Sequence, residues 1–278
     1  MTQAEKAQKL LALHHGEEPL VLINAWDAAS ACIVEEAGFP AIASSSAALA
    51  NALGHPDGQK LPWPEMLDAI KRIASAVKVP VTADIEAGFA STAQELETTM
   101  ESVIASGAVG VNLEDALPGH GDRGPLYSLP DQVARIQAAR RAGEKRGVHL
   151  VINARTDAYW QAGGKPEDAL RATLERGKAY LKAGGDCIFV PGLRDPEHIR
   201  TVVRELNSPI NVLATTGAPS LPELKKLGVK RVSYGSGPMR AAMGLLRRIA
   251  REAQTTGTYN ALLEGAVPYQ EMNALFER

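Results

Sequence analysis

The sequence has only two cysteines, Cys32 and Cys187, and they stand far apart along the chain. This spacing excludes a disulfide framework and a CxxC motif. No apolar run approaches the roughly 20 residues that cross a bilayer, and the opening MTQAEKAQKL is too polar for a secretory signal. We therefore expect a cytoplasmic protein without a membrane partner.

The sequence also lacks a strong excess of charge of either sign. Its formal net charge is -2 at pH 7, from 30 basic and 32 acidic residues. The densest basic stretches, 135–146 and 240–251, have the spacing of solvated helix faces. Because nucleic acids and anionic membranes require a concentrated basic patch, we expect neither as a partner.

Short strand-like runs are what the sequence does contain. Its 278 residues, 45% of them hydrophobic, supply a large core. Eight apolar or β-branched runs alternate with longer Ala/Leu-rich stretches of helical periodicity. The runs cover residues 21–25, 41–46, 81–86, 110–115, 150–157, 187–191, 211–215 and 231–235. Runs of this kind are typical of parallel strands that are buried on both faces.

Eight successive βα units predict a (β/α)₈ TIM barrel. The main alternative, an open doubly wound sheet, typically carries G-x-G-x-x-G after its first strand, and NAWDAASA stands there instead. We predict one barrel domain over residues 1–278. It would have an N-terminal helix within 1–19 and a C-terminal helical extension over 246–278. The apolar face of this extension must pack against another surface.

Charged side chains gather at the predicted strand ends, where barrel active sites lie. Residues i and i+2 of a strand share a face, so Asp84 and Glu86 at the end of the third strand point the same way. Glu114 ends the fourth strand, and Arg155 lies near the end of the fifth. Three neighbouring strands thus bring three carboxylates and one guanidinium to one rim.

Carboxylates without cysteine or histidine favour a hard cation, Mg²⁺ or alternatively Mn²⁺. The competing interpretation makes them ordinary strand-end acids bonded to loop amides or arginines. Several buried like charges are costly without compensation, which favours the metal site. Two interpretations of Arg155 stay open: a structural counter-ion, or a bidentate clamp for a substrate carboxylate.

These residues stand in six motifs: NAWDAASA, SSSAALANALGHPDG, TADIEAGF, GVNLEDA, INARTDAY and RVSYGSGPM. In order and spacing, from about residue 20 to about 245, they resemble the isocitrate lyase/phosphoenolpyruvate mutase superfamily. The resemblance implies a barrel that binds Mg²⁺ and a 2-oxo acid. It also implies a homo-oligomer, a dimer or tetramer, in which C-terminal helices are swapped between subunits.

The resemblance also assigns site residues. The metal site would consist of Asp84, Glu86 and Glu114, with one direct ligand and the others holding metal-bound water. Asp57 would belong to a gating loop, and Arg155 would lie near the substrate. Substrate-binding positions would be Trp26, Asp27, Ser44, Ser45, Ser46, Ala47, Asp84 and Arg155.

The sequence departs from the family pattern in two places. Lyase branches carry a cysteine in a K-R-C-G-H loop after strand four, whereas this chain has LPGHGDRGPLYS there. Cys32 and Cys187 occupy predicted core positions and cannot replace it. The mutase branch has an asparagine in this loop and a histidine after strand six, where this chain has Pro191. These departures count against isocitrate-type cleavage and against phosphonate chemistry.

The remaining metal and arginine suit decarboxylation of oxaloacetate, because a leaving CO₂ needs no general base. We therefore predict a Mg²⁺-dependent carbon–carbon lyase acting on a small 2-oxo acid, with water, Tyr159 or Tyr234 as the proton donor. Hydrolysis would need Asp57, His55 or His120 as a base. Phosphonomutase or methylisocitrate lyase-type activity and a non-catalytic 2-oxo-acid binding protein are the alternatives. A Schiff-base aldolase lacks its strand lysine.

Overall fold

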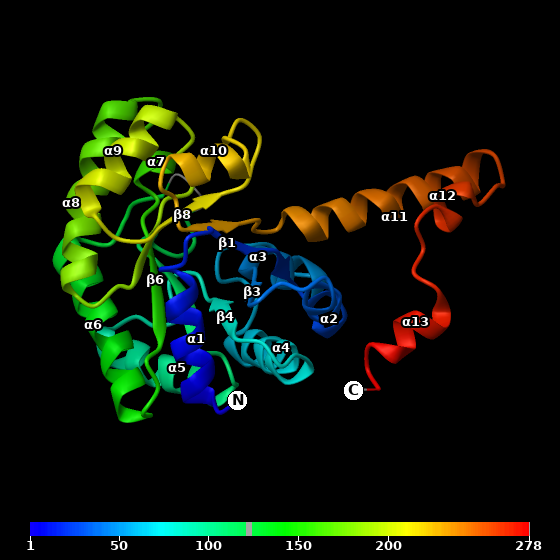
Figure 1. Ribbon diagram of the computed structural model, residues 1–278, viewed down its shortest axis with the longest axis horizontal. Helices are drawn as coiled ribbons and strands as arrows, with labels where there is room; N and C mark the ends of the chain where they lie inside the picture. The colour runs from blue at the N-terminus through cyan, green and yellow to red at the C-terminus, as the bar shows by residue number, and fades with distance from the viewer. Residues whose placement is uncertain (121–123, 278) are drawn as a thin grey trace.

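The computed structural model describes residues 1–120 and 124–277. Nine parallel strand segments form one sheet in the order β1-β9-β8-β7-β6-β5-β4-β3-β2, which curls into a nearly closed barrel (Figure 1). The prediction of a TIM-type barrel is confirmed. The segments are β1 Leu20–Leu22, β2 Asn24–Ala25, β3 Ile42–Ser44, β4 Val81–Asp84, β5 Gly110–Glu114, β6 Val151–Arg155, β7 Cys187–Phe189, β8 Ile210–Leu213 and β9 Arg231–Ser233.

The first predicted strand, 21–25, is two segments in the structure. β1 pairs with β9, the last strand, through Leu20–Leu22. After Ile23 the chain changes partner, and β2 pairs with β3. The eight expected strands are therefore all present, and the interrupted first one forms the seam of the barrel.

Helices follow the strands and cover the outside of the barrel (Figure 1). Several begin at capping boxes, such as Thr92 with Glu95 at the start of α5, which satisfy the first free backbone N–H groups. The helices are α1 Gln3–Leu13, α2 Ala28–Glu36, α3 Ser46–Ala52, α4 Trp63–Ala76, α5 Ala93–Ala105, α6 Leu129–Lys145, α7 Ala158–Gln161, α8 Pro166–Lys182, α9 Pro196–Leu206, α10 Leu221–Lys226, α11 Gly237–Thr255, α12 Asn260–Leu263 and α13 Tyr269–Ala274.

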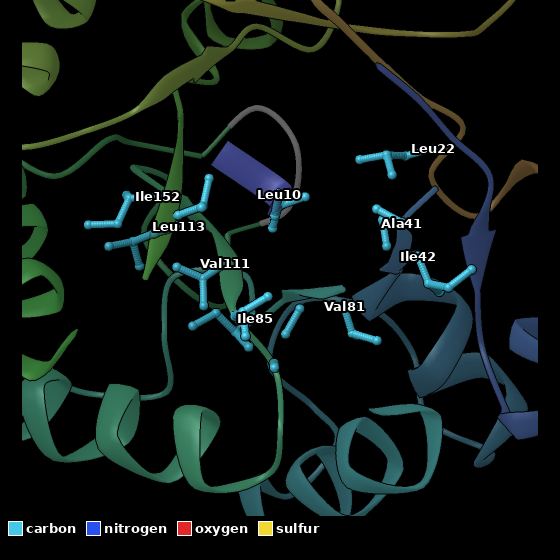
Figure 2. Packing of buried hydrophobic residues seen from close by; sticks show 14 of the residues in the cluster. Leu10, Leu22, Ala41, Ile42, Val81, Ile85, Val111, Leu113 and Ile152 are labelled. Carbon is cyan, nitrogen blue, oxygen red and sulfur yellow. The ribbon is translucent and has the colours of Figure 1, made fainter. Parts of the chain in front are cut away.

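The core lies mainly between the outer face of the sheet and these helices. Ile85, Val111, Leu113 and Ile152 are fully buried, and Figure 2 shows them packed among their neighbours. The inner face is more polar. Register pairs Asp84 with Asn112 and Asn112 with Asn153, so one inner row carries a carboxylate and two amides.

Helix α1 packs against the amino-terminal end of the barrel. Its Leu10 lies so close to Gly110 that a Cβ there would come within 2.8 Å of the leucine Cδ2. His14, just after α1, is fully buried, and its Nε2 lies 3.3 Å from Arg231 Nη1. This end of the barrel is therefore filled, and open space is left at the carboxyl ends of the strands.

A long α11 projects away from the barrel and leads into α12 and α13 (Figure 1), and Leu275, just after α13, is buried in the hydrophobic core. Of α11 only Met239 is buried, while Met243 and Leu246 are about half exposed, at 48% and 55%. Over the described residues, no helix has both the length and the apolar character that a membrane span requires.

Candidate active site

A cavity of about 420 Å³ opens at the carboxyl ends of the strands, which we call the rim cavity. Inward-facing side chains form its floor, and the loops after β3, β4 and β5 form its walls. The charged residues around it are Asp57, Lys60, Asp84, Glu86, Glu114, Arg155, Asp157 and Arg240. Barrel enzymes place their active sites at this end of the sheet.

Asp84 ends β4 and is held by the neighbouring strand. Its Oδ2 accepts hydrogen bonds from the backbone N–H and the hydroxyl of Ser46, at 3.0 and 2.8 Å. Its backbone N–H donates to Ser44 Oγ at 2.9 Å. The other oxygen, Oδ1, is buried and has no hydrogen-bond partner among the described residues.

Glu86 lies in the turn after β4 rather than in the strand itself. Its Oε2 accepts from the backbone N–H of Gln59 at 2.6 Å, and its buried Oε1 has no partner within the described residues. Burial, together with the charges of Asp57 and Asp84, raises the pKa of Glu86 to about 8. A nearby cation would relieve both effects.

The turn around Glu86 is conformationally strained. Glu86, Phe89 and Gln59 have positive φ angles of 53°, 51° and 57°, a region that non-glycine residues rarely adopt. Gln59 connects the loop after α3 with the turn after β4, since its Oε1 also accepts from the backbone N–H of Phe89 at 2.7 Å. Strain of this kind persists where surrounding contacts impose it, and it is common at functional sites.

The buried Arg135 of α6 also holds this turn in place. Its guanidinium donates to the backbone oxygens of Ala87 and Ala90. It also lies over the ring of Tyr127, 4.4 Å from the ring centroid. Because the Arg135 guanidinium holds these two carbonyl oxygens, it also fixes the position of Glu86 in the turn.

Arg155 of β6 is paired with two carboxylates. Its Nη1 lies 2.7 Å from Glu114 Oε2, while Nε and Nη2 donate to the two oxygens of Asp157 at 2.6 and 2.9 Å. The guanidinium also lies over Trp160, 4.8 Å from the ring centroid. Burial raises the pKa of Glu114 well above its ordinary value, and the charge of Arg155 opposes that rise.

A further network holds Asp157 in place. Its backbone N–H donates to Oδ1 of Asp115, which is fully buried. Oδ2 of Asp115 accepts from the Tyr180 hydroxyl at 2.7 Å and from Arg176 Nη1 at 3.1 Å. The pair of Arg155 and Asp157 is therefore fixed by groups that lie outside the rim cavity.

The structure brings most of the predicted site residues together. They come from four strand ends and the loop after α3. The predicted residues that line the rim cavity are Ser45, Ser46, Ala47, Asp57, Asp84, Glu86, Glu114 and Arg155.

Four predicted residues lie outside this lining, each for a visible reason. Asp27 is exposed and caps α2 by accepting from the backbone N–H of Ser30 at 2.7 Å. The Ser44 hydroxyl oxygen accepts a hydrogen bond from the backbone N–H of Asp84. Trp26 and Tyr234 are partly buried and pack against the hydrophobic core.

The other expected proton donors and bases also lie away from the rim cavity. The Tyr159 hydroxyl is 2.8 Å from His198 Nδ1, and neither Tyr159, His55 nor His120 lines the cavity. Both cysteines are buried core residues, as predicted. The pKa of the Cys187 thiol is raised to about 12 by burial, so it is not a reactive thiol.

The structure adds site residues that the sequence analysis did not assign. Asn24 Oδ1 accepts from the backbone N–H groups of Tyr234 and Gly235, both at 2.8 Å, so these amides are not free to cradle a phosphate. Asn112, Asp157 and Gln59 also line the cavity. Strand alternation placed Asn112 on the face of Glu114, whereas contacts between distant loops brought in Gln59.

The donor set fits a hard cation. The orphaned Asp84 Oδ1 and Glu86 Oε1 are buried acceptors that lack a hydrogen-bond donor within the described residues. In residues 1–120 and 124–277, no three Asp, Glu, His or Cys side chains converge as a complete ligand set. Mg²⁺ keeps several waters and needs only one or two direct carboxylates, so this arrangement suits it.

Comparison with known proteins agrees with this geometry. Residues 10–254 match the phosphoenolpyruvate phosphomutase family. The chain belongs to the isocitrate lyase/phosphoenolpyruvate mutase superfamily. The 2-methylisocitrate lyase of Halalkalibacterium halodurans is 29% identical over 279 residues, which cover 98% of this chain and 89% of the relative.

Solved structures of the superfamily have the same fold. A protein from Burkholderia cenocepacia J2315 is 36% identical with a TM-score of 0.90, covering 99% of this chain and 97% of its own. Oxaloacetate acetylhydrolase in complex with the product oxalate is 25% identical with a TM-score of 0.85, and the match covers 97% of this chain and 93% of that one. Phosphonopyruvate hydrolase in complex with oxalate and Mg²⁺ is 26% identical with a TM-score of 0.83, and the match covers 97% of this chain and 94% of that one. The 2-methylisocitrate lyase, the oxaloacetate acetylhydrolase and the phosphonopyruvate hydrolase are enzymes.

Proposed function

We propose that this superfamily member is a Mg²⁺-dependent lyase that breaks the C3–C4 bond of a small 2-oxo acid, one carbon beyond the 2-oxo carbonyl. Decarboxylation of oxaloacetate is the working reaction. One observation carries the proposal: buried carboxylates with orphaned oxygens face the same cavity as a paired, partly buried arginine. Such a site is built to hold a cation and an anionic ligand together.

Asp84 would hold the cation directly, since Ser46 fixes one of its oxygens and leaves the other buried and unpaired. Glu86 and Glu114 would hold water around the cation. When bound, Mg²⁺ supplies a Lewis acid for the carbonyl and its adjacent carboxylate. Mn²⁺ accepts the same oxygen ligands and would substitute.

The substrate carboxylate would lie near Ser45 and Ala47 at the start of α3. Ser45 Oγ accepts from the backbone N–H of Ala48 at 3.4 Å, which leaves its own proton free to donate to a ligand. Both donors of Ser46 are already used by Asp84. Ser46 therefore serves the carboxylate of the protein rather than that of the substrate.

Arg155 would act first as a counter-ion. Asp157 and Glu114 occupy its donors in the structure, which favours this of the two interpretations left open by the sequence. Its positive charge beside the cavity still favours an anionic ligand. Loss of CO₂ leaves the electron pair of the broken bond on the remaining fragment, and no base has to remove a proton in that step.

The test uses purified protein with oxaloacetate and Mg²⁺, following pyruvate release with and without EDTA. Asp84→Asn keeps the size of the side chain and removes its charge. Asp68→Asn, in an exposed ion pair with Arg72, is the matched control. Turnover that needs Mg²⁺ and is lost only in the Asp84 variant supports the proposal. A wild-type protein without turnover would refute decarboxylation of oxaloacetate.

A second candidate is hydrolysis of the same kind of substrate. Asp57 lines the cavity close enough to Glu86 to raise its pKa, so a carboxylate base is at hand. Acetate and oxalate, instead of pyruvate, would identify this reaction. Phosphonopyruvate and 2-methylisocitrate in the same assay test the mutase and methylisocitrate lyase alternatives. Ligand binding without any turnover would indicate the non-catalytic binder.

We also propose that the chain forms a homo-oligomer through its C-terminal helices. The exposed large hydrophobic residues of this arm are Met243, Leu246, Tyr259, Leu262, Leu263, Val267, Tyr269 and Phe276. A mostly apolar groove of about 730 Å³ lies outside β1, between the end of α1 and the segment Ala37–Pro40. In a helix-swapped dimer, α11 of a second copy would cover such a surface.

A further inference from the structure

Arg231 is a fully buried arginine inside the barrel. It begins β9, and its side chain crosses the interior to β5 on the opposite side of the sheet order. Nη2 donates to Asn112 Oδ1 at 3.1 Å, and Nη1 lies 3.3 Å from His14 Nε2. No described carboxylate forms an ion pair with this guanidinium, and these two hydrogen-bonding contacts are to neutral groups.

The contact fixes the orientation of the Asn112 amide. A guanidinium can only donate, so the amide atom that faces it must be the oxygen. Asn153 Nδ2 donates to the same oxygen at 2.6 Å, which uses both of its lone pairs. Burial lowers the pKa of Arg231 to about 10, and the group remains charged and donating at neutral pH.

Asn153 alone would not set this orientation. Its own Oδ1 is buried and has no partner within the described residues. If Arg231 were absent, the amides of Asn112 and Asn153 could turn over together and keep one hydrogen bond between them. Arg231 therefore determines which end of each amide faces which way.

The outcome is a free donor at the rim cavity. Asn112 is only 5% exposed, and it lines the cavity. With both lone pairs of Oδ1 occupied, Nδ2 is the group left for a ligand, and it donates to no group in the described part of the chain. An amide N–H₂ held in a mostly buried position selects an acceptor oxygen and disfavours a donor.

We infer that Arg231 is a positioning residue that holds the Asn112 amide with Nδ2 toward the rim cavity, where it donates to an oxygen of the bound 2-oxo acid. The kind of ligand rests on the function proposed above. The orientation itself depends only on the contacts of Arg231, Asn112 and Asn153.

Calorimetry with Mg²⁺ and oxalate tests the inference. Asn112→Leu keeps the approximate shape and removes the donor, and we expect oxalate to bind about tenfold more weakly. Arg231→Met should weaken binding to a similar degree. Asn211→Leu is the matched control, since Asn211 is also a fully buried strand amide but does not line the cavity.

A double-mutant cycle separates orientation from charge. If Arg231 acts through Asn112, Arg231→Met will cause no further loss in the Asn112→Leu background. Fully additive losses would overturn the inference, because they would mean that Arg231 attracts the anion only by its charge. Unchanged affinity in Asn112→Leu would also overturn it.

A spectroscopic measurement covers the case in which a variant does not fold. The side-chain ¹⁵N–¹H signals of Asn112 in the wild-type protein should shift when oxalate is added with Mg²⁺, and constant signals would overturn the inference. A wild-type protein that binds oxalate but does not turn over oxaloacetate would refute the proposed reaction alone. A wild-type protein that binds no oxalate would refute both.

Discussion

Ser46 donates both its backbone N–H and its hydroxyl to one carboxylate oxygen of Asp84, at 3.0 and 2.8 Å. The carboxylate is thereby oriented before any ligand arrives. Groups that orient a metal ligand in this way typically change metal affinity by about 10- to 100-fold when they are removed.

Ser46→Ala should therefore weaken Mg²⁺ binding by about tenfold, at the lower end of that range, because the backbone donor remains. Calorimetric titration of the protein with Mg²⁺ measures this change in affinity. Ser102→Ala removes an exposed hydroxyl that donates to Thr98 and serves as the control. Equal affinities in the Ser46 variant and wild type would contradict the proposed metal position.

Mg²⁺ should stabilise the folded protein, since an ion that binds only the native state shifts unfolding by mass action. At 100 times the Kd the gain is about 2.7 kcal/mol, which thermal unfolding detects easily. EDTA should remove the gain, and Asp84→Asn should not show it. The same rise in Tm in Asp84→Asn would place the ion elsewhere.

Asp157→Asn should lower kcat/KM for the 2-oxo acid by about ten- to a hundredfold, as for other groups that hold a side chain of the site in position. The change frees Arg155 from its bidentate partner, so the guanidinium no longer holds its position beside Glu114. Asp168→Asn breaks an exposed pair with Arg171, and such pairs contribute little. Steady-state kinetics of both variants should differ clearly; similar values would refute the positioning role.

His14 should make the stability of the protein sensitive to pH. Burial, together with the charge of Arg231, lowers the pKa of His14 to about 3. Arg231 can only donate, so Nε2 is the acceptor, and Nδ1–H donates to the Leu10 carbonyl oxygen at 2.8 Å. The folded state therefore holds the neutral ring.

Between its ordinary pKa of 6.5 and the lowered value, His14 binds a proton only in the unfolded chain. The contribution of His14 to the free energy of unfolding is thus fully present above pH 6.5. It decreases as the pH falls, by about 2 kcal/mol from pH 7 to 5. Chemical unfolding at several pH values should show a smaller decrease in His14→Gln than in wild type or His15→Gln. An unchanged slope in His14→Gln would contradict this assignment.

The C-terminal arm should control the oligomeric state. Glutamate at Met243 and Leu246 puts charge on the exposed apolar side of α11, so a double variant should shift the protein toward monomer. Light scattering coupled to size exclusion measures the mass directly, with exposed Gln254→Glu on the same helix as the control. A wild-type monomer would refute the proposed assembly.

Strand positions and the acidic rim followed from sequence because they depend on local patterns. Strand alternation and strand ends were enough to bring Asp84, Glu114 and Arg155 to one rim of the barrel. The pairing partner of a strand is not a local property, so the division of 21–25 between β9 and β3 was not visible.

The roles of individual side chains were harder to predict for the same reason. Ser46 looked like a donor to the substrate, but only the structure shows that Asp84 uses both of its donors. Asp157 was visible two residues after Arg155, yet its bidentate contact depends on how Asp115 holds its backbone. Gln59 reaches Glu86 from another loop through a left-handed conformation that its residue type does not indicate.

The seam of the barrel has a consequence for how the chain reaches its native state. β1 can pair only after β9 exists, so the ribosome must have synthesised the chain through Ser233 before the sheet can close. Until then Leu20 and Leu22 present an open strand edge, which is a site for pairing with the wrong chain. Protection of this edge during translation, by α1 or by a chaperone, would therefore favour correct closure of the sheet.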